Sequence, residues 1–593
     1  MTRPIQVTGL IAAFATLAGP TLGFESQLRG AMTDSVEASV RASSRVLAAR
    51  RENVTSPQDI ITAAQSDYRQ ITAALYDAGY YGGTVNIQVD GVEAAAISPL
   101  NVPAQVSTVT LTVDAGARFA FGRASVTPLA PGTDLPDGFA PGQAAELTAI
   151  KQASSIAIDG WRAASHAKAS VGAQRIVARH PSAQLDVDLR IVPGPALAFG
   201  QIEFSGSDTV RNERLAQIAG LPIGQPFSPQ DLETAATRLR RSGVFRSVAL
   251  READTPNADG TLDISAQLVE YKPRRFGFGA EISSFEGGTL SAYWLHRNLF
   301  GGAERFRVDG EVSGLGSNTG IDYAITTRIA RPATFWTDTT AYIEANIALL
   351  DEPDYYSRQA GFEFGLEAII TDDLTASAGL GYRYSDVRDD LGERTFSHIV
   401  FPLSLAWDRR DSEVDAKNGT YVQADGLPFV GMSGSATGTR AYADARAYRG
   451  FGTDDRFVLA GRLQVGSVFG AGLADTPPDL LFHSGGGGTV RGQPYQSLGV
   501  DLGGGDRVGG RSFLGASGEV RAEVWDNVSA VAFYDVGWIA ETSVPGDGSM
   551  HAGAGIGVRY ATGIGPIRLD MAKPVAGDTG NGYQIYVGIG QAF

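Results

Sequence analysis

Residues 512–524 read SFLGASGEVRAEV, and this stretch decides the fold class. Successive side chains of an extended strand point to opposite faces, so Leu514 and Val520 share one face, and Glu519 and Arg521 share the other. A soluble β-sandwich also alternates, but its strands rarely run beyond about ten residues. A long strand with one apolar and one charged face is typical of a transmembrane β-barrel, with lipid outside and a polar lumen inside.

The same alternation continues on both sides of this stretch. Residues 528–538 read VSAVAFYDVGW, which places Tyr534 on the lipid side and Asp535 on the lumen side. At about 20 residues per strand and turn, residues 272–593 accommodate sixteen antiparallel strands, an even number as in bacterial barrels. The strands are expected to begin near Phe276, Thr289, Ala303, Gly320, Thr339, Ser357, Asp373, Ser397, Asn418, Thr437, Asp455, Ser512, Asn527, Met550, Gly563 and Gly582.

Upstream of Tyr271 the pattern changes to short strands alternating with helical stretches. Phe121-Gly122 and Phe199-Gly200 open two similar segments 78 residues apart, and residues 24–115 accommodate a third copy. We predict three α+β modules of order β-α-α-β-β, with long helices at 57–78, 144–165 and 229–242.

These patterns divide the chain into five segments. Residues 1–23 combine a positive start, an apolar stretch and small residues, as a secretory signal peptide does. The predicted boundaries are 1–23 for the signal peptide, 24–115, 116–195 and 196–271 for the modules, and 272–593 for the barrel, with a long lumen-folding loop at 469–511.

Composition argues against several classes of function. The chain has 65 acidic and 49 basic residues, a net charge of −16, which disfavours binding to nucleic acid phosphates. It has no cysteine, its six histidines are scattered, and no lysine follows a glycine as in a P-loop. We therefore expect no enzyme activity, no metal site and no cofactor, although a catalytic group in the lumen remains an alternative.

The loop at 469–511 is too long for a simple turn, and loops of this length usually have a function. It contains GGTVRG, ending at Gly492, and YQSLG at 495–499. These segments resemble the VRGY/F motif in the sixth extracellular loop of the BamA/TamA superfamily of outer-membrane insertases and transporters. The other matching segments are Asp408–Asp411 with Asn418-Gly419, Gly509–Ser512, Phe533–Gly537 and Gly565–Asp570.

The glycines that follow two predicted helices, Gly79 and Gly243, are expected to take the left-handed conformation. The hinges they form resemble those of periplasmic POTRA modules, which are thought to bind polypeptide by adding a strand to a sheet edge. Three such modules and the SLG segment resemble the TamA branch of the superfamily. Gln493, where an aromatic residue is usual, and Ala416, where proline is common, depart from the family pattern.

The resemblance implies a location and a set of partners. The barrel would lie in the bacterial outer membrane with its modules in the periplasm, among outer-membrane lipids. It would insert autotransporters and other barrel proteins with a TamB-like inner-membrane-anchored partner. The alternatives are a two-partner secretion transporter, whose plug helix residues 24–50 could partly mimic, and a passive outer-membrane pore.

Within the loop, Arg491 is the residue expected to hold the loop in the lumen. A buried guanidinium is costly unless carboxylates pair with it, and Glu519 and Asp535 have the lumen-facing parity of adjacent strands. We predict a loop lock made of Val490, Arg491 and Gly492 with these two acids, joined by charge-assisted hydrogen bonds. Separate solvation of the three charged residues is the alternative.

The barrel is expected to close by pairing its first strand with its last. The first strand is predicted near residues 276–285, with Phe276 and Gly279 at the seam, and the last near residues 583–593, with Tyr583, Gly588 and Phe593 at the seam. A terminal aromatic residue resembles the sorting signal of barrel proteins. Because glycines weaken a strand, this seam is predicted to open and to template an incoming strand.

Overall fold

The computed structural model describes residues 24–98, 102–283, 287–317, 320–563 and 565–593. The predicted signal peptide at 1–23 lies outside the described residues. The chain forms two compact units. One contains the residues up to 200 together with 223–230 and 254–262, and the other contains 201–222, 231–253 and 263–593. Among the described residues, no helix is both long enough and apolar enough to cross a membrane.

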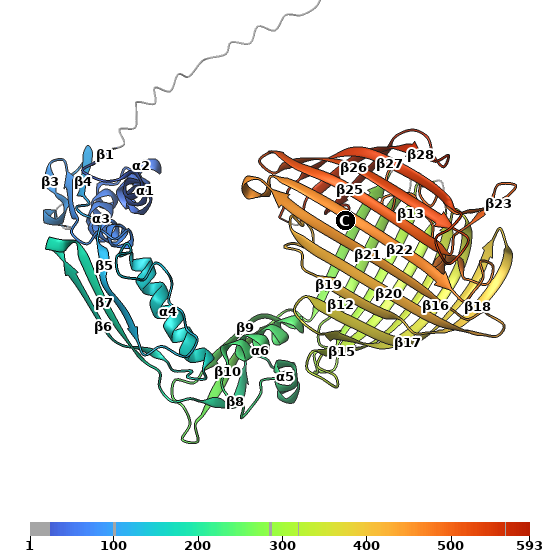
Figure 1. The fold of residues 1–593 in the computed structure, drawn as a ribbon, viewed down its shortest axis with the longest axis horizontal. Coiled ribbons are helices and arrows are strands. Elements are labelled where there is room, and N and C mark those ends of the chain that lie inside the picture. The colour runs from blue at the N-terminus through green and yellow to red at the C-terminus, as the bar shows by residue number, and fades with distance from the viewer. Residues whose placement is uncertain (1–23, 99–101, 284–286, 318–319, 564) are drawn as a thin grey trace, which may run out of the picture. The chain divides into compact units, whose positions relative to one another are not determined.

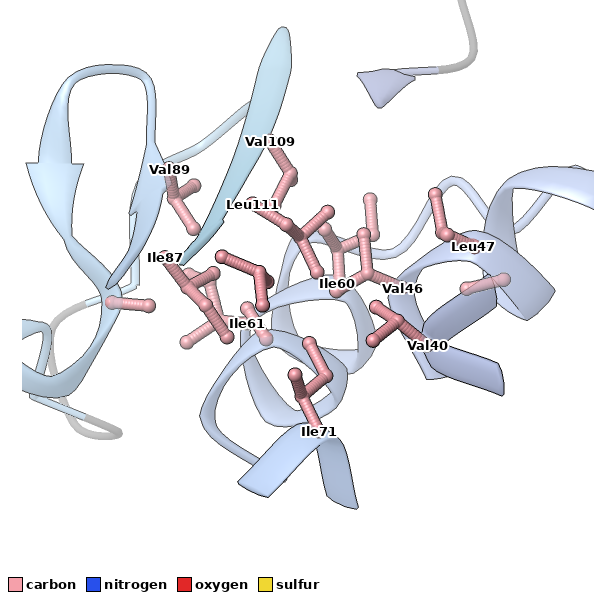
Figure 2. Close-up of a cluster of buried hydrophobic side chains, with 14 of the residues drawn as sticks. Val40, Val46, Leu47, Ile60, Ile61, Ile71, Ile87, Val89, Val109 and Leu111 are labelled. Atoms are coloured by element: carbon pink, nitrogen blue, oxygen red, sulfur yellow. The ribbon is translucent and has the colours of Figure 1, made fainter. Parts of the chain in front are cut away.

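The first module has more helices than the repeat predicts. Its elements are β1 (Glu25–Arg29), α1 (Asp34–Ser43), α2 (Arg45–Arg51), α3 (Pro57–Asp77), β2 (Thr84–Val89), β3 (Val92–Glu93), η1 (Ala94–Ala96) and β4 (Thr108–Asp114). The strand order is β1-β4-β2-β3. Figure 2 shows Val40 and Val46, from α1 and α2, beside Ile60 and Leu111 in one apolar core. The expected β-α-α-β-β order is therefore wrong for this module.

The second module has a single α-helix. It consists of β5 (Ala120–Thr127), α4 (Leu147–Ala163), β6 (Ser170–Arg179), η2 (His180–Ser182) and β7 (Gln184–Val192), with strand order β5-β7-β6. The expected pair of helices is wrong here too. Residues 128–146 contain four prolines and three glycines, which cannot continue a helix, and they form a loop instead.

The third module follows the predicted order. It comprises β8 (Ala198–Ser205), α5 (Asn212–Ala219), α6 (Pro229–Arg241), β9 (Phe245–Glu252) and β10 (Thr261–Glu270), in the sheet order β8-β10-β9. Gly79 and Gly243 have φ of +84° and +73°, which confirms their predicted left-handed conformation.

The rest of the chain forms one large antiparallel sheet curled into a barrel, drawn from green to red in Figure 1. Its strands are β11 (Arg274–Ser283), β12 (Gly287–His296), β13 (Arg305–Leu315), β14 (Asp322–Arg331), β15 (Thr339–Glu352), β16 (Tyr355–Ile369), β17 (Leu374–Asp389), β18 (Gly392–Val400), β19 (Leu403–Asp408), β20 (Gly419–Met432), β21 (Gly438–Phe451), β22 (Phe457–Phe469), β25 (Ser512–Trp525), β26 (Val528–Ala540), β27 (Ser549–Tyr560), β28 (Ile567–Ala576) and β29 (Gln584–Ile589). A short 3-10 helix, η3 (Thr453–Asp455), lies in the turn after β21.

Strands β18 and β19 occupy one position, because both pair with β17 on one side and β20 on the other. Pro402 separates them, since proline has no N–H to donate to the ladder. Among the described residues, the first and last strands, β11 and β29, pair over two residues, Ile282 with Val587 and Ser283 with Tyr586. The count of sixteen strands in a fully closed barrel therefore stays a prediction.

The alternation that predicted the barrel appears in its side-chain exposure. On β25, Val520 is 52% exposed on the outer surface, whereas Glu519 is 2% exposed on the inner one. On β26, Tyr534 is exposed and Asp535 is buried. The apolar side chains therefore cover the outside of the sheet, and the charged ones line its interior.

Candidate functional site

The connection between β22 and β25 folds back into the barrel and is held there first by apolar packing. It contains η4 (Pro478–Leu480) and a hairpin of β23 (Val500–Gly503) and β24 (Asp506–Val508). Leu480, Phe482 and Leu498 from the loop join Phe429 and Phe513 from the wall in one buried cluster. The loop and the wall thus share a hydrophobic core.

Arg491, near the middle of the loop, makes a fork to two carboxylates of the wall. Its Nε and Nη2 donate to Asp535 Oδ2 and Oδ1 at 2.7 and 2.9 Å, and its Nη1 donates to Glu519 Oε1 at 2.6 Å. Its backbone N–H also donates to Asp535, at 3.1 Å. The structure therefore brings together the residues predicted for the loop lock, with Val490 buried beside them and Gly492 next in the loop.

Two further wall residues complete this site, and the sequence analysis did not assign them to it. Asp570 Oδ2 on β28 lies 3.5 Å from Arg491 Nη1. The Phe533 ring lies beneath the guanidinium, whose Cζ is 3.6 Å from the ring centroid, a cation–π geometry. Both residues have lumen-facing parity, so strand alternation places them on the inner wall, but it does not show that they reach Arg491.

Glycines on β27 make room for the loop. A Cβ at Gly553 would lie 1.8 Å from the carbonyl oxygen of Arg491, closer than any real contact. Gly555 and Gly557 face the lumen on the same strand, and a Cβ there would meet the Phe533 ring and the Asp570 carboxylate, respectively. The small face of β27 therefore lets the loop backbone lie against the wall.

The electrostatics of the lock favour the charged form of Arg491. Burial by itself lowers the pKa of the guanidinium, but the charge and hydrogen bonds of Asp535, followed by the charges of Glu519 and Asp570, outweigh burial and raise the pKa. A buried group with three carboxylates around it stays ionised, and each charge depends on the others.

The same network extends to the end of the chain. Glu519 accepts from Arg521 Nε at 2.9 Å, and Arg521 Nη2 donates to the carbonyl oxygen of Phe593 at 3.3 Å. On the other side, Arg559 Nε donates to Gln591 Oε1 at 2.9 Å, and the Gln591 amide donates to Asp415 at 2.7 Å. Charged groups thus connect the loop lock to the last three residues.

The residues after Arg491 contact β27, β29 and the turn between β28 and β29. The Gly492 N–H donates to the hydroxyl of Tyr586 on β29 at 3.1 Å. Gln493, a departure from the family motif, donates its amide to the carbonyl of Ala552 at 2.7 Å and accepts from Thr579 Oγ1 at 2.9 Å. The loop is therefore bonded to the hairpin that forms one side of the seam.

The seam itself differs from the prediction. The strands are those expected, but the paired residues are Ile282 with Val587 and Ser283 with Tyr586. The five predicted seam residues make none of these pairs: Phe276 and Gly279 pair with β12, Gly588 pairs with β28, and Tyr583 and Phe593 lie outside β29.

Gly590 explains where the last strand ends. Its φ is +92°, and its N–H donates to the Pro566 carbonyl at 2.7 Å, so the chain turns out of the ladder there. Phe593 then packs with Ala416, Tyr448 and Ala460, which line the wall, and is buried. Glycine supplies this turn because other residues resist a positive φ.

Within the described ranges, no group of three or more histidine, aspartate or glutamate side chains is arranged to hold a metal ion. The absence of a metal or cofactor stays an expectation.

Comparison with known proteins identifies the two parts of this architecture. Residues 298–593 match the Omp85 superfamily domain, and residues 197–270 match the POTRA family, described as a surface antigen variable number repeat. The chain therefore contains an Omp85 superfamily domain preceded by a POTRA domain. The loop lock therefore lies inside the Omp85 domain, and the third module is its POTRA domain.

Individual relatives agree with this assignment. The chain is 22% identical over 505 residues to the outer membrane protein assembly factor BamA of Neorickettsia risticii (strain Illinois), covering 79% of this chain and 65% of that relative. The chain thus spans just under two thirds of the length of this curated relative.

Two solved structures share the fold. The crystal structure of BamA from Haemophilus ducreyi lacking POTRA domains 1-3 superposes with a TM-score of 0.64 at 17% identity, covering 80% of this chain and 100% of that one. CdiB from Acinetobacter baumannii gives a TM-score of 0.50 at 12% identity, with coverage of 80% and 89%. At these identities the similarity establishes the fold alone.

Proposed function

We propose that this Omp85 protein assembles other barrel proteins in the bacterial outer membrane, with its modules in the periplasm. The single observation that carries the proposal is the short seam. Strand β11 pairs with β12 over ten residues but with β29 over two, so residues 274–281 have no β29 partner among the described residues. In lipid, each unpaired backbone group costs several kcal/mol, so this edge favours pairing with another strand.

The incoming strand would come from an unfolded client. Pairing of the client strand with β11 would give hydrogen-bond partners to the unpaired backbone groups of both strands. The folding of the client would supply the free energy, without nucleotide or enzymatic chemistry. The POTRA modules would receive the client first. The second module has a free sheet edge at β6, where Ile176 and Val177 are exposed, which is a suitable place for such pairing.

Within the superfamily we assign the chain to the TamA branch. This assignment rests on three modules and on the SLG segment at Ser497–Gly499 after the loop motif. It carries with it autotransporters as clients and a TamB-like partner anchored in the inner membrane. A gene immediately downstream that encodes a very large β-rich protein would support the presence of this partner.

Two-partner secretion is the second candidate, because CdiB shares the fold. This candidate predicts that residues 24–50 partly mimic a plug helix. Val36, Val40 and Val46 of this segment instead lie in the core of the first module (Figure 2 labels Val40 and Val46). That packing favours the assembly function over this candidate.

A covalent lock at the seam tests the proposal. The chain has no cysteine, and paired Cα atoms of neighbouring antiparallel strands lie about 4.5 to 5.5 Å apart, within disulfide range. In the full chain reconstituted in liposomes, an Ile282→Cys/Val587→Cys disulfide should block insertion of a barrel client, and reduction should restore it.

The matched control is a disulfide between two strands away from the seam. Leu459 and Val520 pair on β22 and β25, and both face outward. A Leu459→Cys/Val520→Cys lock should leave insertion unchanged. Normal insertion by a chain that mass spectrometry shows to be fully locked at the seam would rule out opening of the seam.

A further inference from the structure

A cavity of about 1080 Å³ lies where the third module meets the turn between β14 and β15. Arg214 and Arg238 come from helices α5 and α6, and Arg331, Phe335 and Trp336 come from the end of β14 and the turn. Ile370, after β16, completes the outer rim. All of these residues belong to the same compact unit of the chain.

The turn is built to hold its aromatic side chains outward. Ala333 and Phe335 have φ of +47° and +68°, a region that residues other than glycine avoid unless their surroundings enforce it. Arg214 enforces it here, because its guanidinium donates to the carbonyl oxygens of Pro332 and Ala333. Phe335 and Trp336 are consequently 77% and 70% exposed.

The cavity has an excess of positive charge in a strongly acidic chain. Its lining holds three arginines and one carboxylate, Asp338, which is bonded to Arg238. Arg331 lies at the rim with its side chain 46% exposed, 3.6 Å from the buried carboxylate of Glu304. Arg214 is buried, and its guanidinium donates to backbone carbonyl oxygens and to the side-chain oxygen of Gln217. Such a cavity would accept an anion.

The position of the cavity beside the outward-facing apolar side chains indicates which kind of anion it binds. The neighbouring strands carry exposed apolar side chains on their outer face, Ile325 on β14 and Ile343 on β15, and the turn lies just beyond their ends. In a membrane protein this level is the interface, where tryptophan rings lie beside headgroups. An anion attached to apolar chains fits both the arginines of the cavity and the apolar side chains at its rim.

We propose that this cavity binds the phosphate of a glycerophospholipid from the periplasmic leaflet, with its acyl chains against Phe335, Trp336 and Ile370. Arg331 and Arg238 hold the phosphate, and Arg214 positions the turn. The inference goes beyond client assembly and shares with it only the membrane location. A lipid held here would be fixed to the junction between the third module and the barrel.

Native mass spectrometry of the full chain in detergent tests the site. The probes are dilauroyl phosphatidylethanolamine and dilauroylglycerol, which has the same chains and no phosphate. Wild type should retain the phospholipid at least fivefold better than the glycerol lipid. Arg331→Gln should remove this preference, and Trp336→Ala should weaken retention of both lipids.

Trp525 supplies the matched control. It is the exposed last residue of β25, next to the short turn before β26, and it does not line this cavity. Trp525→Ala should retain the phospholipid as wild type does. Equal retention of both lipids by wild type, unchanged preference in Arg331→Gln, or displacement of the phospholipid by millimolar inorganic phosphate would each overturn the proposal. Heat-modifiable gel mobility establishes that every variant is folded, and client insertion is measured separately.

Discussion

The N–H of Gly492 donates a hydrogen bond of 3.1 Å to the hydroxyl of Tyr586, which joins the long loop to the last strand. Tyr586 is also one of the two β29 residues that pair with β11. The same residue therefore contacts the loop lock through its side chain and the seam through its backbone. This arrangement makes the stability of the seam depend on the seating of the loop.

Removing that hydroxyl should loosen the seam. Tyr586→Phe leaves the Gly492 N–H without this acceptor, and loss of a buried hydrogen-bond partner costs about 1 to 3 kcal/mol. In an Ile282→Cys background, accessibility of the introduced thiol to a membrane-permeant maleimide should rise about fivefold or more. Tyr534→Phe, on the outer face of β26, should leave the labelling rate unchanged. Equal labelling rates in Tyr586→Phe and Tyr534→Phe would show that the hydrogen bond between the loop and Tyr586 does not stabilise the seam.

Adding a methyl group at Gly492 should unseat the loop. The φ of this residue is +93°, and a Cβ would lie 2.6 Å from the carbonyl oxygen of Lys573. Backbone strain of this kind costs about 1 to 3 kcal/mol before the clash is added. Gly492→Ala should make the loop sensitive to protease at a lower temperature than in wild type.

Gly503 is the control for this substitution. Its φ is +87°, but an added Cβ would meet nothing within 4 Å. Gly503→Ala carries the conformational cost without the clash, so its loop should stay protected. Similar protease sensitivity in both variants would show that the loop is not seated against β28 as described.

Arg491 should be the most costly single residue to remove from the lock. Arg491→Ala leaves Glu519, Asp535 and Asp570 buried without their shared cation, and breaking a buried pair in this way costs about 3 to 5 kcal/mol. Heat-modifiable mobility should be lost at a lower temperature. Arg491→Lys should recover little of the difference, because an ammonium group cannot make the fork. Arg307→Ala, which removes an exposed pair with Asp309, should match wild type.

The loop should be less stable in acid because of His483. Burial lowers the pKa of this imidazole from 6.5 to about 4, outweighing the nearby carboxylate of Asp354 at 3.5 Å. Between these values the unfolded loop binds a proton that the folded loop does not. The free energy of unfolding of the loop is therefore unaffected by His483 protonation above pH 6.5, and it falls by up to about 3 kcal/mol as the pH approaches 4.

Protease protection of the loop, followed from pH 7 to pH 4.5, measures this effect. Arg507, bonded to Asp354, and Tyr355 are the other ionisable groups that face His483. His483→Gln should reduce the pH dependence, whereas substitution of His166, which is outside the barrel, should not. Part of the dependence should survive in His483→Gln, because the buried His551 contacts the loop through Ser484 at 2.8 Å. An unchanged pH dependence in His483→Gln would assign it to another group.

Strand alternation accounts for most of what the sequence predicted correctly. A period of two residues assigns each side chain to lipid or lumen, and that placed Glu519 and Asp535 opposite the loop. Asp570 was missed because it lies on β28, two strands from Asp535, and only the glycine face of β27 lets one guanidinium reach both. Alternation does not predict the space that these glycines leave for the Arg491 side chain.

The errors at the seam and in the modules have local causes. The end of β29 depends on the turn at Gly590 and its bond to Pro566, which a strand pattern does not contain. The second module has one helix instead of the expected two because residues 128–146 are rich in proline and glycine. A repeat spacing predicts that modules exist but not which elements each copy keeps.

The most direct test of the central claim traps a client strand on β11. Single cysteines placed at Phe278 on β11 and at Leu459 on β22, both outward-facing, can be paired with single cysteines along the last strand of a barrel client. During insertion into liposomes, Phe278→Cys should form a disulfide with client positions that alternate along the strand, and Leu459→Cys should form almost none. Equal trapping at the two positions would contradict the account, because the client would then be entering the membrane without pairing to the open edge.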